Sequence, residues 1–66
     1  GIDGGDYYRS IFKQLSETAY KGHLYLEIDP NVRDLVVNLA LENDAKILYI
    51  KRDYLKLDRI IKIIFI

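Results

Sequence analysis

The sequence predicts a small α/β fold whose elements follow the order helix, strand, helix, strand, strand. Two stretches carry apolar residues at helical spacing, and shorter stretches alternate or are almost wholly apolar, as strands are. The link before the last strand is too short for a helical crossover, so this strand must reverse direction. We therefore expect a three-stranded mixed sheet in the order 23–28, 59–66, 46–51. The last strand is antiparallel and central, and both helices lie on one face.

The first helix is predicted over residues 7–20. Apolar residues recur there at helical spacing, while charged residues fall mostly on the other side. Asp6 is placed to cap the N-terminus of this helix. Gly22 is placed to close its C-terminus, in the left-handed conformation that glycine adopts without strain. The predicted inner stripe consists of Tyr8, Ile11, Phe12, Leu15 and Ala19.

Alternation of apolar and polar residues predicts a strand at 23–28, and a second helix follows at 30–43. Asp29 is a good N-cap, and Pro30 suits the first helical position because its missing N–H needs no partner there. Asn43 tolerates the left-handed conformation that ends a helix. The predicted inner stripe of this helix consists of Val32, Leu35, Val36, Leu39 and Ala40.

The two remaining strands differ in their apolar content. The strand at 46–51 should run parallel to 23–28, because a helix joins the two. Residues 60–66 are apolar on both faces of a strand except at Lys62. Strands of that kind lie in the interior of a sheet, which predicts a central place for the last strand.

Composition limits the classes of protein to consider. The chain has 66 residues, half of them hydrophobic, which is enough for one domain with a core. Ten basic and ten acidic residues give zero net charge, which argues against a dedicated nucleic-acid-binding protein. There is no cysteine, no recognisable signal peptide and no apolar run long enough to span a bilayer. These features predict a cytoplasmic protein without a membrane partner.

Candidate site residues are few. The glycine-rich lead-in at residues 1–6 is interpreted as a turn before a helix, because it lacks the remaining glycines of a phosphate-binding fingerprint. Asp3 and Asp6 are too few oxygen ligands for a calcium loop. His23 has no nucleophile to form a triad, and Glu27 has no second carboxylate beside it in the sequence. We therefore assign no catalytic and no metal-binding residue.

Three short motifs span most of the chain: DGGDYYR at 3–9, LYLEI at 24–28, and Asp53 followed by DRI at 58–60. The first resembles the DGG…(F/Y)YR stretch that follows the catalytic loop in release-factor glutamine methyltransferases of the HemK type. The second resembles the LxLEI strand of that family, and the third resembles its KD…DRVV ending. All three occur in the family's order and at near-family spacing.

The resemblance implies that residues 1–66 are a single unit, the C-terminal part of a methyltransferase domain that uses S-adenosylmethionine. Such domains have a Rossmann-like, seven-stranded sheet whose last strand is antiparallel and lies between the fifth and the sixth. The family methylates the glutamine of the GGQ motif in peptide-chain release factors. Its glycine-rich cofactor loop and its Asn-Pro-Pro-Tyr loop are both missing from this sequence. The chain alone is therefore expected to bind no S-adenosylmethionine and to be inactive.

The resemblance also assigns Asp3, Gly4 and Gly5 to a substrate loop. It names the remainder of the methyltransferase domain and a release factor as partners. Lys56 stands where the family commonly has glycine. In the whole domain another strand would pair with 23–28, so we expect the isolated chain to self-associate or to be only marginally folded.

Two other classes of function stay open. The chain is alternatively a free-standing α/β module that binds a protein through its sheet face or edge. A small RNA-binding α/β domain is the least favoured class, because the net charge is zero. A longer reading frame with both missing loops upstream would favour the methyltransferase over the module.

Overall fold

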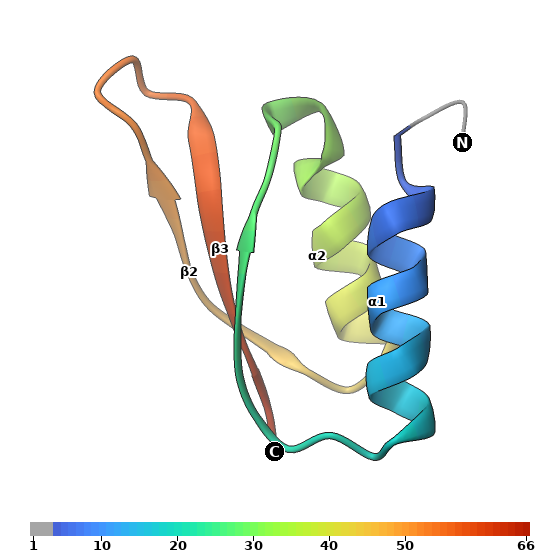
Figure 1. Cartoon of the computed structure of the whole chain (residues 1–66). Coiled ribbons are helices and arrows are strands. Elements are labelled where there is room, and N and C mark those ends of the chain that lie inside the picture. The colour runs from blue at the N-terminus through green and yellow to red at the C-terminus, as the bar shows by residue number, and fades with distance from the viewer. Residues whose placement is uncertain (1–3) are drawn as a thin grey trace.

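The computed structural model describes residues 4–66, which form two α-helices and one three-stranded sheet (Figure 1). The predicted order of elements is confirmed, and the boundaries shift by a few residues. The elements are α1 (Asp6–Glu17), β1 (Gly22–Glu27), the short 3₁₀-helix η1 (Pro30–Val32), α2 (Arg33–Glu42), β2 (Lys46–Arg52) and β3 (Asp58–Phe65).

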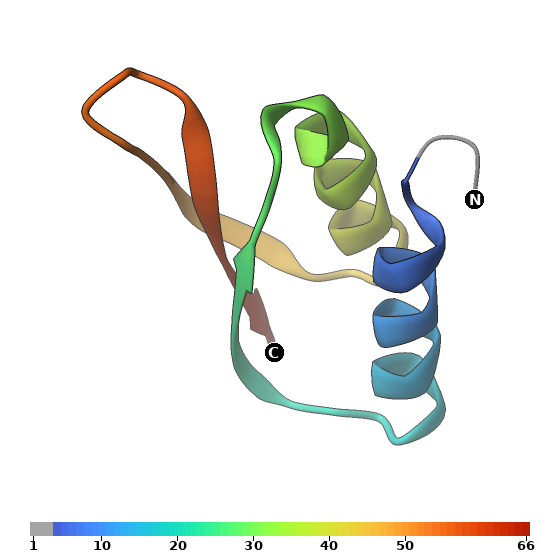
Figure 2. The same ribbon diagram turned by 45° about the horizontal axis from the view of Figure 1, so that its top comes forward.

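The strands lie in the order β1-β3-β2, and β3 runs antiparallel to both neighbours. The predicted order and the central place of the last strand are therefore confirmed. The prediction of a mixed sheet is wrong. Although β1 and β2 run parallel, they never pair with each other, so every hydrogen-bonded pair is antiparallel. Both helices lie on one face, and no described element covers the other face (Figures 1 and 2).

The core lies between the helices and the sheet. Its largest fully buried side chains are Phe12 on α1, Val36 on α2, and Ile61 and Ile63 on β3. Burying a side chain of this size contributes about 1.5–3 kcal/mol. The buried residues are Phe12, Leu26, Ile28, Val32, Val36, Ala40, Ala45, Ile61, Ile63 and Phe65.

Two positions of the predicted inner stripes are wrong. Ala19 lies beyond the end of α1 and is exposed. Leu35 is half-buried, whereas Val37, which the pattern left out, packs against the core. The other four predicted residues, Val32, Val36, Leu39 and Ala40, are buried or pack against the core, so the predicted stripe holds through η1 and α2 except at Leu35.

The ends of α1 also differ from prediction. Gly5 is the N-cap, and Asp6 is the first helical residue, where its carboxylate pairs with Arg9 at 3.2 Å. At the other end Ala19, with φ of 51°, takes the position that closes the helix, whereas Gly22, whose φ of 126° is also positive, is the first residue of β1. The Tyr20 N–H donates to the Leu15 carbonyl at 3.0 Å, which completes a Schellman motif without glycine.

The second helical segment begins at Pro30 as predicted, but as the 3₁₀-helix η1; α2 itself begins at Arg33, with Val32 as its N-cap, and its end is displaced by one residue. Asp29 caps the helical segment, because its Oδ1 accepts the Asn31 N–H at 2.9 Å. Asp44, not Asn43, takes the left-handed conformation, with φ of 59°. The Ala45 N–H then donates to the Ala40 carbonyl at 3.0 Å, so this helix also ends in a Schellman motif.

Candidate functional site

The predicted substrate loop lies at the N-terminal end of α1. Gly4 and Gly5 belong to the described residues, and Asp3 lies outside them. Gly4 has φ of 72°, and a Cβ on it would lie 3.9 Å from Val32 Cγ1. Gly5 is buried, and its carbonyl accepts the Arg9 N–H at 2.9 Å. Gly4 thus lies beside Val32 of η1, at the start of the second helix.

The outer edge of β1 has no neighbouring strand in the described chain. The Ile28 N–H donates inward to the Arg59 carbonyl at 2.7 Å. Because inward and outward backbone groups alternate along an antiparallel pair, those of His23, Tyr25 and Glu27 point away from the sheet. This alternation defines three outward positions, with Tyr25 in the middle.

Two tyrosine hydroxyls reach this edge. The Tyr8 hydroxyl donates to the Glu27 carbonyl at 3.0 Å, and the Tyr20 hydroxyl donates to the His23 carbonyl at 2.7 Å. Burial raises the pKa of Tyr8, with smaller contributions from neighbouring Tyr7 and nearby carboxylates, so its hydroxyl stays a donor at neutral pH. The carbonyls of His23 and Glu27, at the two ends of the edge, are therefore hydrogen-bonded to tyrosine hydroxyls. The middle of the edge, at Tyr25, is open.

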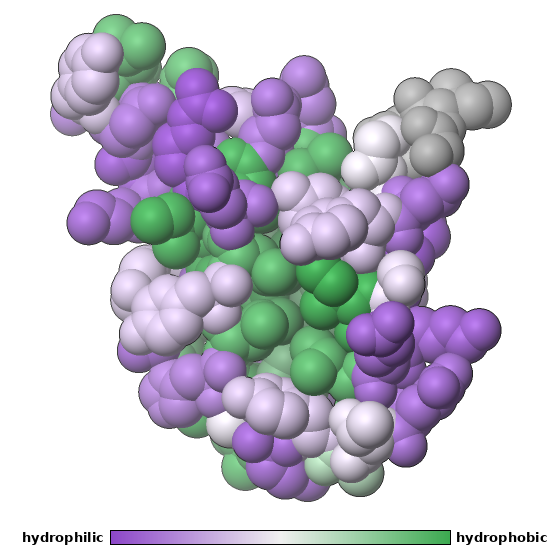
Figure 3. All heavy atoms as spheres, viewed as in Figure 1, coloured by the Kyte–Doolittle hydropathy of each residue, from purple (hydrophilic) through white to green (hydrophobic). Residues whose placement is uncertain are grey.

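Apolar surface accompanies the open edge. Figure 3 shows apolar residues gathered between β1 and α1, with hydrophilic residues on both sides. Ile11 and Leu15 of α1 and Leu24 of β1 pack against the core but are only partly buried. We call these three side chains, with the outward backbone of β1, the β1 edge surface. It offers hydrogen-bonding backbone groups beside incompletely covered apolar side chains.

The β2–β3 hairpin is organised by Asp53. Its Oδ1 accepts the N–H groups of Leu55 at 2.8 Å and Leu57 at 3.1 Å, and its Oδ2 accepts from Arg59 Nε at 3.0 Å. The bond from Arg59, followed by these backbone bonds, lowers the pKa of Asp53. Lys56 completes the turn with φ of 66°, a conformation that favours glycine.

The neighbouring aspartate, Asp58, ties the hairpin to α2. Its side chain is only 15% exposed and meets Arg33 Nε at 3.1 Å and Arg52 Nε at 3.0 Å. Arg59 of the same motif also forms an ion pair, with Asp53. The motif at 53–60 thus has a structural role in this fold.

The face of the sheet that points away from the helices, called the outer face, has three cross-strand rows. Ile61 and Ile63 point to the core, so Lys62 between them points outward. Lys62 lies opposite Tyr25 on one side and Tyr49 on the other. The rows are Glu27-Ile60-Lys51, Tyr25-Lys62-Tyr49 and His23-Ile64-Lys46.

The middle row forms a cation–π cluster. Lys62 Nζ lies 4.9 Å from the centre of the Tyr25 ring and 5.8 Å from that of Tyr49. Interaction of the Tyr25 hydroxyl with the Lys62 ammonium lowers the pKa of Tyr25 and raises the pKa of Lys62. Lys62 therefore remains charged at neutral pH. His23 and Glu27 are exposed on this same face.

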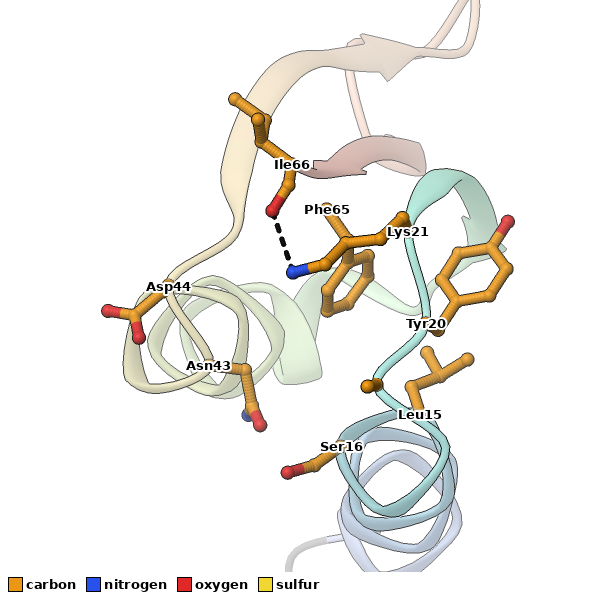
Figure 4. Close-up of a pocket in the computed structure, with 9 residues that line it drawn as sticks. Leu15, Ser16, Tyr20, Lys21, Asn43, Asp44, Phe65 and Ile66 are labelled. Carbon is orange, nitrogen blue, oxygen red and sulfur yellow. Dashed lines mark hydrogen bonds between the residues drawn. The ribbon is translucent and has the colours of Figure 1, made fainter.

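A pocket of about 180 Å³ lies where both helices end, next to the end of β3 (Figure 4). Lys21 Nζ donates to the Ile66 carbonyl at 2.9 Å at one side of it. Pockets for drug-sized ligands are larger, about 300–1,000 Å³. The pocket therefore suits a few water molecules. Its lining residues are Leu15, Ser16, Ala19, Tyr20, Lys21, Asn43, Asp44, Phe65 and Ile66.

Within residues 4–66 no cluster of three or more histidine, cysteine, aspartate or glutamate side chains could hold a metal ion. Neither helix of this part of the chain is long and apolar enough to cross a membrane. The chain matches no family model, no curated protein and no solved structure at a significant level.

Sequence reasoning missed both the tyrosine hydroxyls at the β1 edge and the Tyr25-Lys62-Tyr49 row. Tyr8 and Glu27 are 19 residues apart, so no local pattern joins them. The row depends on a register shift between Ile47 and Tyr49 in β2. A signal that could have been read is the crowding of basic residues after position 45, where six basic residues face two acidic ones.

Proposed function

We propose that this chain is the C-terminal portion of an S-adenosylmethionine-dependent methyltransferase that acts on peptide-chain release factors. The observation that carries the proposal is the β1 edge surface. An edge strand without pairing partner, beside apolar side chains that are only partly covered, is suited to receive a further strand. In the proposed parent domain that strand precedes α1 and pairs with β1.

Two further observations support the proposal. The last strand lies antiparallel between two strands that are parallel to each other, which is an uncommon arrangement and agrees with the end of the sheet in that fold class. Lys56, at the position where the resembled family commonly has glycine, has a φ that favours glycine. In this proposal the chain contributes structure. The cofactor, the catalytic loops and the reaction belong to the remainder of the domain, and Asp3, Gly4 and Gly5 lie next to the substrate.

A second candidate function is a free-standing module that binds a protein strand. The bonds from the Tyr8 and Tyr20 hydroxyls favour a chain that folds on its own, because they already satisfy two outward carbonyls of β1 without a strand from a larger domain. The same edge would then receive a strand from another protein.

Fragment complementation separates the two functions. The 66-residue chain is mixed with a release-factor glutamine methyltransferase truncated before its DGG motif, and methyl transfer from labelled S-adenosylmethionine to a release factor is measured. We expect transfer only when both pieces are present. Tyr25→Pro removes the outward N–H in the middle of the edge and should abolish transfer, whereas Tyr25→Ala keeps that N–H and should preserve it.

Sedimentation of the same mixtures reports whether the two pieces associate. A complex that forms without methyl transfer would favour the free-standing module. Absence of both a complex and transfer would overturn the proposed methyltransferase function.

A further inference from the structure

The zero net charge of the chain conceals a strong separation of charge. Residues 1–44 contain four basic and eight acidic residues, a net charge of −4. Residues 45–66 contain six basic and two acidic residues, a net charge of +4. The positive part comprises β2, β3 and the loop between them. Clustering of positive charge on one face or element is part of the electrostatic signature of nucleic-acid binding, and the total charge does not show it.

Part of this positive charge lies on the outer face of the sheet. Lys46, Lys51 and Lys62 project there, and Glu27 is the one carboxylate in the three rows. None of the three lysines forms a salt bridge with a carboxylate in the described part of the chain. Their charges are therefore available to an anionic partner.

The same face carries two exposed aromatic rings. Tyr25 is 57% exposed and Tyr49 is 43% exposed, although both lie within strands. Strands are about 4.8 Å apart, so two side chains on the strands either side of β3 are about 10 Å apart, with Lys62 between them. Exposed rings that alternate with basic side chains on an open sheet suit planar bases joined by phosphates.

We propose that the outer face binds a single-stranded nucleic acid, with bases stacked on Tyr25 and Tyr49 and phosphates at Lys46, Lys51 and Lys62. An acidic peptide would engage the lysines but leave the rings without planar partners. A second copy of this chain would bring the two Lys62 rows against each other, and like charges repel. This proposal does not depend on the methyltransferase function, because it uses side chains on the outer face, whereas the β1 edge surface consists of the outward backbone of β1 and side chains that pack against the core.

The test is fluorescence anisotropy with a labelled oligouridylate of about twelve nucleotides, within the site sizes known for such platforms. We expect binding at low salt. Tyr25→Ala and Tyr49→Ala should each weaken it about tenfold, whereas Tyr25→Phe and Tyr49→Phe keep the ring and should bind like the unchanged chain. Lys62→Ala should lower the slope of log K against log salt by about 0.7.

Tyr54→Ala is the matched control, because Tyr54 is 90% exposed but lies in the loop between β2 and β3. It should leave the affinity unchanged, and circular dichroism confirms that each variant is folded. The proposal is overturned if the oligonucleotide does not bind at low salt, or if Tyr54→Ala weakens binding as much as Tyr25→Ala. It is also overturned if poly-glutamate competes as well as unlabelled oligouridylate, since the partner would then be an acidic peptide.

Discussion

β1 and β2 both pair only with β3, but the pairing of β1 is continuous, whereas β2 shifts register between Ile47 and Tyr49 and again between Lys51 and Arg52. Bulges of this kind twist an edge strand and make further pairing difficult. Three basic residues, Lys46, Lys51 and Arg52, also lie on β2, and β1 has no lysine or arginine.

The difference indicates that the two edges have different roles. β2 has the features by which natural sheets prevent edge-to-edge pairing, while β1 has a regular edge, an open centre at Tyr25 and apolar surface beside it. The tyrosine hydroxyls at Glu27 and His23 cover the two ends of that edge. We infer that β2 is an outer boundary and that β1 is the side at which a strand is added.

The largest effect is expected for Phe12→Ala, which tests how far the β1 side depends on α1. Phe12 is 2% exposed, and its ring centre lies 6.0 Å from that of Phe65. Such a truncation costs about 3–5 kcal/mol. A chain of 66 residues has a total stability of about 3–10 kcal/mol, so the variant should be largely unfolded. Urea unfolding followed by circular dichroism measures the loss.

The control for this variant is Tyr7→Ala, on the same helix. Tyr7 is 68% exposed, so its truncation should change the free energy of unfolding by less than about 1 kcal/mol. If Phe12→Ala were as stable as the control, the packing of α1 would not be needed for stability. The β1 side of the sheet would then not depend on α1, contrary to this prediction.

A smaller effect is expected when the hydroxyls at the β1 edge are removed. Tyr8→Phe and Tyr20→Phe each delete one hydrogen bond to an outward carbonyl, which should cost about 0.5–1 kcal/mol. Freed carbonyls should also promote edge pairing, so sedimentation should detect more self-association. Tyr54→Phe, on the loop next to β2, should alter neither measurement. Unchanged stability in both variants would mean that these bonds do not protect the edge.

Glycine substitutions should stabilise both sides of the sheet by a similar amount. Ala19 before β1 and Lys56 before β3 have φ of 51° and 66°, which costs a non-glycine residue about 1–2 kcal/mol. Part of this gain is lost to the greater freedom of glycine in the unfolded chain, so Ala19→Gly and Lys56→Gly should each add about 0.5–1 kcal/mol. Ser10→Gly, within α1, should instead destabilise by about 0.5–1 kcal/mol. In thermal unfolding, Ala19→Gly and Lys56→Gly should raise the melting temperature, and Ser10→Gly should lower it.

The smallest effect concerns acid and is confined to the hairpin beside β2. The pKa of Asp53 in the folded chain lies below its ordinary value of 3.8, chiefly because Arg59 bonds to its carboxylate. The stabilisation is therefore present above the ordinary pKa and is lost as pH falls through the lower, folded value. Asp53→Asn should reduce stability at neutral pH and flatten its dependence on pH below about 4. An Asp53→Asn chain with the same acid dependence as the parent would contradict this role.

The sequence alone determined the order of the elements, the order of the strands and the central place of β3. These follow from properties that are local in the chain: helical spacing in α1, the Asp29-Pro30 start of the second helical segment, and a run at 60–66 that is apolar on both faces. The short link before β3 excluded a crossover, so its direction was also determined.

Only the tertiary structure decided which residues meet at the two surfaces. The Tyr25-Lys62-Tyr49 row requires the register shift in β2, and a shift by one residue moves a side chain to the opposite face. The bond from Tyr8 to Glu27 depends on how α1 packs beside β1. Likewise, α1 ends at Glu17 and Ala19 takes the left-handed position after it, although Gly22, which also has a positive φ, is the better residue for such a turn. Local patterns determine the kind of element, whereas contacts between distant segments set its register and its exact end, because those contacts outweigh the small preferences of single residues.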